Sequence, residues 1–367
     1  MRITTSMSAN NAVYYINQGR QRMDNLNETI ATQQRVNTPS DDPVSAKKIL
    51  DLQAQSKTTD QYLSNIKNGV LWLDMAGTTL EGVFDTVSQL KSIANQAVNG
   101  LNDPLKKQDL MTSLRLYRDQ LMDVPNSALI GDQNIFSGFN STSKPFPVQT
   151  VTANTTAGST SLTNIDTTGF TLGMPITGPG IPDNTIVTAI TTPGPGGAVT
   201  LSSAATATAT GASLSFKGVY KGTDDLLKIE VNSGMQIDIN VTGGTLLRGG
   251  TPPASTGVDI IKTIDQLMLD ISNGNQSGVI SAASSLTAAS TQLQNVISDV
   301  GMRKARLDNI QAFQERKGNV LQTLISNLQE VDLAKAATQL TQEKTSFEAA
   351  LAATAKITPL SLLDFLR

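Results

Sequence analysis

The sequence contains no cysteine and no histidine among its 367 residues, and only one tryptophan. The absence of cysteine excludes disulfide scaffolds and thiolate metal sites. Without histidine there is no imidazole ligand, no Ser-His-Asp or Cys-His nucleophile and no histidine general base. No catalytic arrangement survives this inventory, so we expect a protein that is not an enzyme and that uses no cofactor and no metal.

Charge and hydropathy exclude two further kinds of partner. Lys and Arg number 28 against 31 Asp and Glu, a net charge of −3, whereas nucleic-acid binding needs a basic surface. No run of 18 apolar residues exists, so no membrane-spanning helix is expected. The start, MRITTSMSANNAVYY, lacks the apolar stretch of a secretory signal peptide. We therefore expect neither nucleic acid nor a membrane as a partner.

Proline and glycine are scarce in the flanks and concentrated in the middle. Nine of the 14 prolines lie between residues 145 and 253, and 17 of the 28 glycines between residues 158 and 257. Proline inside a helix costs about 3 kcal/mol, so the long helices must lie in the flanks. The predicted fold class is mainly α: a long antiparallel helical bundle or coiled coil built from both chain ends, with an inserted all-β domain in the middle.

Apolar residues recur every seven positions in both flanks, as they do in helical bundles and coiled coils. One row is Ile66, Leu73, Leu80, Val87 and Ala94, and another is Leu286, Leu293, Val300 and Leu307. These rows, together with the start signal Asp103-Pro104, predict helices over 43–57, 58–98, 104–130, 257–272 and 277–328.

Two thinner apolar stripes lie near the chain ends. The first consists of Ile16, Met23, Leu26 and Ile30, and the second of Leu333, Leu340, Phe347 and Leu351. Isolated helices are marginal in water and gain most of their stability from packing. Neither stripe buries enough to hold a helix alone, so we expect the two segments to pair with each other and with neighbouring chains.

The stretch PSDDPV at residues 39–44 predicts a helix start rather than a carboxylate site. Pro43 suits the first turn of a helix, and Asp42 or Ser40 can cap the free amides before it. A carboxylate at that position is also favoured by the helix dipole.

The middle of the chain has the composition of strands and turns. Residues 148–216 hold two charges, Asp166 and Asp183, and β-branched runs between glycine and proline clusters. Residues 226–231 and 235–241 alternate around Asn232-Ser233-Gly234, which predicts a hairpin. The low charge indicates a self-contained insert that is dispensable for assembly.

Several motifs occur in a fixed order: MRITTSM at the start, PSDDPV, NIFSGF at 134–139, KPF at 144–146, and a C-terminal stretch ending in SLLDFLR. In combination they resemble the flagellin superfamily. The PSDDP and SLLDFL elements resemble its hook-associated members more than its filament members. The resemblance covers roughly residues 1–146 and 254–367, while 147–216 is similar to a small β repeat of phage-tail and bacterial surface proteins.

The resemblance implies a division into three parts. Residues 1–35 and 331–367 would form a terminal coiled coil that is axial in the assembly and disordered in the monomer. Residues 36–144 and 254–330 would form a central helical bundle. Residues 145–253 would form a variable β domain, in which 147–216 is an extra β insert.

The resemblance also implies a function: a structural component of the extracellular bacterial flagellum, at the junction between hook-associated protein 1 and the flagellin filament. Its implied partners are those two proteins, further copies of itself in a ring, and a cytoplasmic flagellar export chaperone. Export would use the flagellar type III apparatus without a cleaved signal. Two alternatives stay open: a filament flagellin, and a surface adhesin or phage-fibre-like binding protein.

Overall fold

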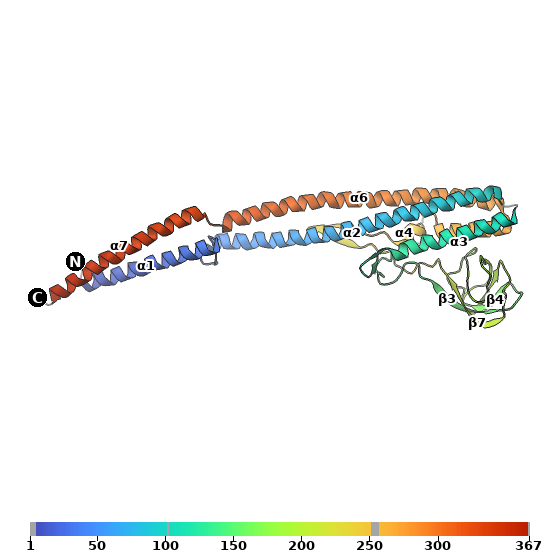
Figure 1. The fold of residues 1–367 in the computed structure, drawn as a ribbon, viewed down its shortest axis with the longest axis horizontal. Coiled ribbons are helices and arrows are strands. Elements are labelled where there is room, and N and C mark those ends of the chain that lie inside the picture. The colour runs from blue at the N-terminus through green and yellow to red at the C-terminus, as the bar shows by residue number, and fades with distance from the viewer. Residues whose placement is uncertain (1–4, 101–102, 251–256, 366–367) are drawn as a thin grey trace. The chain divides into compact units, whose positions relative to one another are not determined.

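The computed structural model describes the backbone of residues 5–100, 103–250 and 257–365, and the side chains within 10–100, 103–250 and 257–355. Its helices are α1 (Thr5–Thr32), α2 (Pro43–Gly100), α3 (Pro104–Ser127), the short α4 (Gly243–Leu247), α5 (Ile260–Asn273), α6 (Gln276–Gln329) and α7 (Leu333–Phe365) (Figure 1). Long helices from both chain ends and a β region in the middle confirm the predicted fold class.

Helix ends agree with the predictions to within three residues. The helix predicted over 104–130 ends at Ser127, where the Ala128 amide caps it on the Pro125 carbonyl, and Leu129–Ile130 form a short strand instead. The helix predicted over 257–272 begins at Ile260. The helices predicted over 43–57 and 58–98 form the single helix α2. Thr58 and Thr59 lie where the two predicted helices meet, and each hydroxyl donates a hydrogen bond of 2.9 Å to the carbonyl four residues earlier, so both are satisfied within an uninterrupted helix. The predicted start of α3 is confirmed, since Asp103 accepts a hydrogen bond from the Leu105 amide at 3.0 Å and Pro104 follows it.

Internal contacts divide the chain into two compact units. We call residues 1–63 with 312–367 the terminal unit, and residues 64–311 the central unit. The division falls inside α2 and α6, because these helices run through it without interruption. Among the described residues, none of the helices combines the length and the apolar character needed to cross a bilayer.

The core of the central unit is built from the predicted seven-residue rows. Ile66, Leu73, Leu80, Val87 and Ala94 of α2 are at most 1% exposed. Leu286, Leu293 and Leu307 of α6 are fully buried in the same cluster. The hairpin of β8 (Lys228–Asn232) and β9 (Met235–Asp238) also packs here, through Val231 and Ile237. The two strands correspond to the predicted hairpin. Because Val231 and Ile237 are buried with the helices, this part of the β region shares their core.

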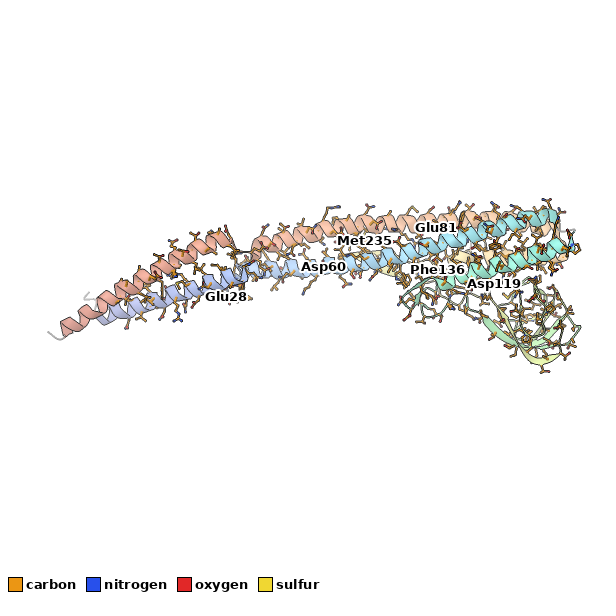
Figure 2. The ribbon with its side chains drawn as sticks, in the orientation of Figure 1. Glu28, Asp60, Glu81, Asp119, Phe136 and Met235 are labelled. Atoms are coloured by element: carbon orange, nitrogen blue, oxygen red, sulfur yellow. The ribbon has the colours of Figure 1, made fainter. Side chains whose placement is uncertain are left out.

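The NIFSGF motif lies in the loop after α3, which also contains the short strands β1 (Leu129–Ile130) and β2 (Gln133–Asn134). Phe136, labelled in Figure 2, is fully buried, and its carbonyl accepts a hydrogen bond from Tyr220 Oη at 3.0 Å. The Lys221 amide donates to the Pro145 carbonyl at 2.9 Å. The segments before and after the insert are therefore tied together without the insert itself.

The insert is a five-stranded antiparallel sheet with its own core. Its strands β3 (Gln149–Thr155), β4 (Ser161–Ile165), β5 (Val187–Thr192), β6 (Gly197–Leu201) and β7 (Ala209–Phe216) follow the order β5-β6-β4-β3-β7. The segment 173–177 bridges both edge strands, with Pro175 opposite Ile186 and Thr177 opposite Ser215. This segment links the start of β5 to the end of β7 and so closes one end of the sheet.

Deleting residues 147–216 is expected to leave a folded helical body. The central unit keeps its own core, and Pro145 and Lys221 already lie within hydrogen-bond distance across the excision. Circular dichroism should show a cooperative helical transition, and a cell carrying the deletion should stay motile. A deletion variant that is secreted poorly or forms no junction would contradict the prediction.

Candidate assembly site

The terminal unit pairs α1 with α7 through a seven-residue pattern on both helices. On α1 the residues facing the seam are Ala12, Ile16, Gly19, Met23, Leu26 and Ile30, and on α7 they are Ala336, Leu340, Glu343, Phe347 and Ala350. Each set steps alternately by three and four residues, which is the spacing of a coiled-coil seam.

Six of the eight predicted seam residues lie half-buried between the two helices. These are Ile16, Met23, Leu26, Ile30, Leu340 and Phe347. The other two are more exposed: Leu333, the first residue of α7, is 45% exposed, and Leu351, one residue past Ala350, is 43% exposed. Leu333 and Leu351 thus contribute least to the pairing of α1 with α7.

Two small residues, Gly19 and Ala336, complete the seam, although neither belongs to the stripes of large apolar residues. Gly19 is buried, and a Cβ added there would lie 3.3 Å from Cδ2 of Phe347, so the ring packs directly against the α1 backbone. Ala336 is 3% exposed. At the rim, Arg22 Nε lies 3.3 Å from Glu343 Oε2, an exposed ion pair of the kind that contributes little. In the sequence, only their spacing from Ile16, Met23 and Leu340 could have identified Gly19 and Ala336 as seam residues.

The two links between helices pair as a short antiparallel ladder. Gln34 lies opposite Glu330, the Arg35 amide donates to the Gln329 carbonyl at 2.7 Å, and the Val331 amide donates to the Gln33 carbonyl at 3.1 Å. Gln33 adopts a left-handed backbone with φ 59° to reach this geometry. The ladder fixes the axial register of α1 against α7, which the thin seam specifies only weakly.

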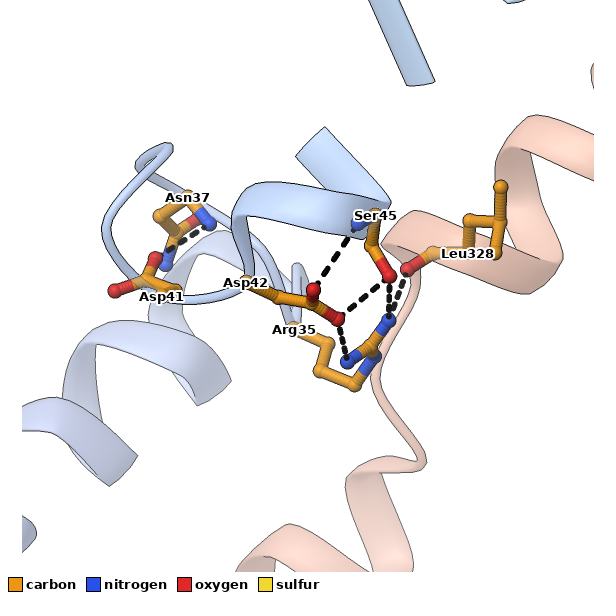
Figure 3. A network of polar contacts seen from close by, with 6 residues as sticks. All are labelled: Arg35, Asn37, Asp41, Asp42, Ser45 and Leu328. Carbon is orange, nitrogen blue, oxygen red and sulfur yellow. Dashed lines mark hydrogen bonds and ion pairs between the residues drawn. The ribbon is translucent and has the colours of Figure 1, made fainter. Parts of the chain in front are cut away.

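Arg35 joins the ends of two helices next to this ladder (Figure 3). Its Nη1 lies 3.3 Å from Asp42 Oδ2, and its Nη2 donates to the Leu328 carbonyl at 2.9 Å in the last turn of α6. Asp42 Oδ1 accepts from the Ser45 amide at 3.0 Å, so Asp42 is the N-cap of α2 and Pro43 is its first residue. A cation at a helix C-terminus and an anion at an N-terminus both suit the helix dipoles.

The remaining residues of PSDDPV shape the turn before α2. Asp41 Oδ2 accepts hydrogen bonds from the Thr38 amide at 2.7 Å and the Asn37 amide at 3.0 Å, which lowers the pKa of this carboxyl. Ser40 lies exposed in the turn, and the cap is formed by Asp42 instead. The two adjacent carboxylates therefore have separate local partners and do not form a joint site.

The cap at Asp42 is expected to depend on pH. Hydrogen bonds from the Ser45 hydroxyl and amide, helped by Arg35, lower the pKa of Asp42 from 3.8 to about 2. Because the pKa is lower in the folded state, the ionised cap stabilises α2 above about pH 4, and this contribution is lost as the pH falls toward 2. Asp42→Ala should speed amide exchange of Ser45 and Ala46 roughly fivefold at pH 7. The ratio of variant to wild-type rates should approach one near pH 2.

Asp51→Ala is the matched control, because Asp51 is exposed on the same helix and makes no hydrogen bond or ion pair within the part of the chain that the structure describes. Its exchange ratio should stay near one at both pH values. A ratio for Asp42→Ala that is the same at pH 2 and pH 7 would mean that the carboxylate charge does not matter to the cap.

Two family models match the helical regions at the two ends of the chain. The model of the bacterial flagellin N-terminal helical region matches residues 3–141, and that of the C-terminal helical region matches residues 284–366. The matched residues include α1, α2, α3 and α7 and most of α6. The chain belongs to the flagellin superfamily. The resemblance inferred from the motifs is thereby confirmed.

Within the superfamily the chain is similar to hook-associated and filament proteins. It is 27% identical over 146 residues to flagellar hook-associated protein 3 of Salmonella typhimurium, an alignment of 40% of this chain and 46% of that protein. It is 22% identical over 136 residues to polar flagellin C of Vibrio parahaemolyticus, over 37% of this chain and 35% of that protein. The matches thus span less than half the length of these curated relatives.

A solved structure shares the fold. The structure of a flagellar hook-associated protein from Vibrio parahaemolyticus superposes with a TM-score of 0.53 at 17% identity, covering 79% of this chain and 100% of that one. All of that structure finds a counterpart here, while about a fifth of this flagellin-superfamily chain lies outside the superposition.

Proposed function

We propose that this protein is a structural component of the bacterial flagellum that forms the junction between the hook and the flagellin filament. The observation that carries the proposal is the pairing of α1 with α7, in which helices from opposite chain ends form a seam that stays half-exposed. Such a seam leaves apolar surface for neighbouring copies. The PSDDP and SLLDFL elements and the similarity to hook-associated protein 3 favour the junction over the filament.

The proposed partners follow from this position. Hook-associated protein 1 would lie on one side, flagellin on the other, and further copies of this chain beside it in a ring. We further propose export through the flagellar type III apparatus without a cleaved signal, with a cytoplasmic chaperone holding the chain before export. A cysteine-free chain with only 4% aromatic residues suits transport in an unfolded state.

Immunogold labelling of isolated flagella tests the proposal directly. We expect label at one position, where the hook meets the filament, and a strain lacking the gene should carry bare hooks. Label along the whole filament, or purified monomer that polymerises unaided into long filaments, would show that the protein is a filament flagellin instead. Normal junctions in the strain lacking the gene would instead favour a surface adhesin whose binding part is the β insert.

A further inference from the structure

The central unit contains a fully buried ion pair that serves neither the cap at Asp42 nor the seam between α1 and α7. Arg118 of α3 and Asp265 of α5 are 1% and 0% exposed. Arg118 Nε donates to Asp265 Oδ1 at 2.5 Å, and its Nη2 donates to Asp265 Oδ2 at 3.2 Å. The pair is bidentate, which fixes the direction as well as the distance of the interaction.

The β insert and the segment after it supply the remaining partners of this pair. The Thr171 hydroxyl donates to Asp265 Oδ2 at 2.7 Å. Arg118 Nη2 also donates to the Lys217 carbonyl, just past β7, at 2.9 Å. The two helices therefore supply the ion pair itself, and the insert and the residue after it supply its two further hydrogen bonds.

Two glycines allow the backbone to come this close. Gly173 has φ +83°, and a Cβ there would lie 1.8 Å from the Asp265 carbonyl oxygen. Gly218 has φ +130°, and a Cβ there would lie 2.8 Å from Arg118 Nη2. At both positions φ is positive and a Cβ atom would clash with the neighbouring residue, so only glycine fits without strain. The insert at Gly173 and the segment after it at Gly218 thus approach Asp265 and Arg118 closely.

Weaker contacts flank the pair along α3. Asn184 Nδ2 donates to Thr112 Oγ1 at 2.9 Å, and Lys217 Nζ lies 2.9 Å from Asp123 Oδ1. Ile186 of the insert packs in the apolar core of the helical body. The two polar contacts lie at exposed positions, where water can replace them, and Ile186 packs without directional bonds. The buried pair, by contrast, is satisfied by only one arrangement of its donors.

A buried ion pair contributes little net stability compared with apolar residues of the same shape, because desolvation offsets the attraction. Its effect is on alternatives: any other orientation of the insert would remove the bonds from Thr171 and to the Lys217 carbonyl, leaving an acceptor of Asp265 and a donor of Arg118 unsatisfied at the interface. We propose that Arg118 and Asp265 lock the β insert in one orientation on the helical body, with Thr171 as the insert's point of engagement. The insert would then project from every subunit at the same angle.

Distances between two spin labels test this lock, and the cysteine-free chain makes the labelling specific. Gln120→Cys on α3 and Thr191→Cys on β5 are both at exposed positions, one on the body and one on the insert. Domains joined by small interfaces move by default, so a single narrow distance distribution in the wild-type background is the result that supports a lock. A broad distribution in that background would overturn the proposal.

Variants then assign the effect to the ion pair. Arg118→Met with Asp265→Leu replaces the pair by apolar groups, which is compatible with folding, and should broaden the distribution at least roughly twofold. Asp123→Asn, which removes only the exposed contact with Lys217, should leave it unchanged. An unchanged distribution in the double variant would overturn the proposal. If circular dichroism shows that the double variant fails to fold, Thr171→Val decides: broadening supports the lock, and an unchanged width rejects it.

Discussion

Replacing Leu340 and Phe347 by glutamate is expected to abolish incorporation of the protein at the hook tip. Full burial of a Leu or Phe side chain stabilises by about 1.5–3 kcal/mol, and in the structure both residues lie half-buried in the seam between α1 and α7. A carboxylate at either position removes that contribution and adds a desolvation cost. Phe347 also packs on the Gly19 backbone, and that contact is lost in the variant.

Cells carrying this double variant should export flagellin into the medium instead of building filaments, which immunoblots of culture supernatants would measure. The central unit has a separate core, so the variant should remain soluble with its helical transition intact. Thr338→Glu with Thr345→Glu is the matched control: the same charge is added on α7, at two positions that are exposed. Normal filaments from the seam variant would refute this account of assembly.

In the free monomer, the amides of α1 and α7 are expected to exchange far faster than those of the central unit. None of the eight predicted seam residues is fully buried, whereas the α2 row in the central unit is at most 1% exposed. Ordering both end segments costs at least about 1 kcal/mol per residue in backbone entropy, and a half-buried seam only partly offsets this. The α1–α7 pairing should therefore be populated mainly when neighbouring copies cover the seam.

Hydrogen exchange followed by mass spectrometry would measure the difference, which should be on the order of a hundredfold or more. After assembly, the same peptides should become protected. Peptides of α5 provide an internal control, because its apolar face is buried in the central core and they should be protected in both states. Slow exchange throughout α1 and α7 in the monomer would show that assembly does not drive their ordering.

Local signals in the sequence determined most of the secondary structure. The apolar rows through Leu73, Leu80 and Leu293 predicted the helices, because residues seven apart lie on the same face only if the segment is helical. Asp42 before Pro43 and Asp103 before Pro104 marked helix starts, since capping uses groups within three residues of each other. The hairpin around Asn232-Ser233-Gly234 follows from the same kind of short-range chemistry. Each of these features involves neighbours along the chain.

Only the tertiary structure decided how distant segments meet. The contribution of Gly19 to the seam, the contact of Arg35 with Leu328 and the closure of one end of the β sheet by residues 173–177 all depend on partners far along the chain. Arg118 and Asp265 each lie on the buried face of their helix, at the spacing of Leu114 and Leu121 and of Ile261 and Met268. They are 147 residues apart, however, so the period indicates burial but does not show that the two charges pair. Periodicity records which face of a helix is buried, but charged and small residues acquire their roles from the backbone that folding brings against them.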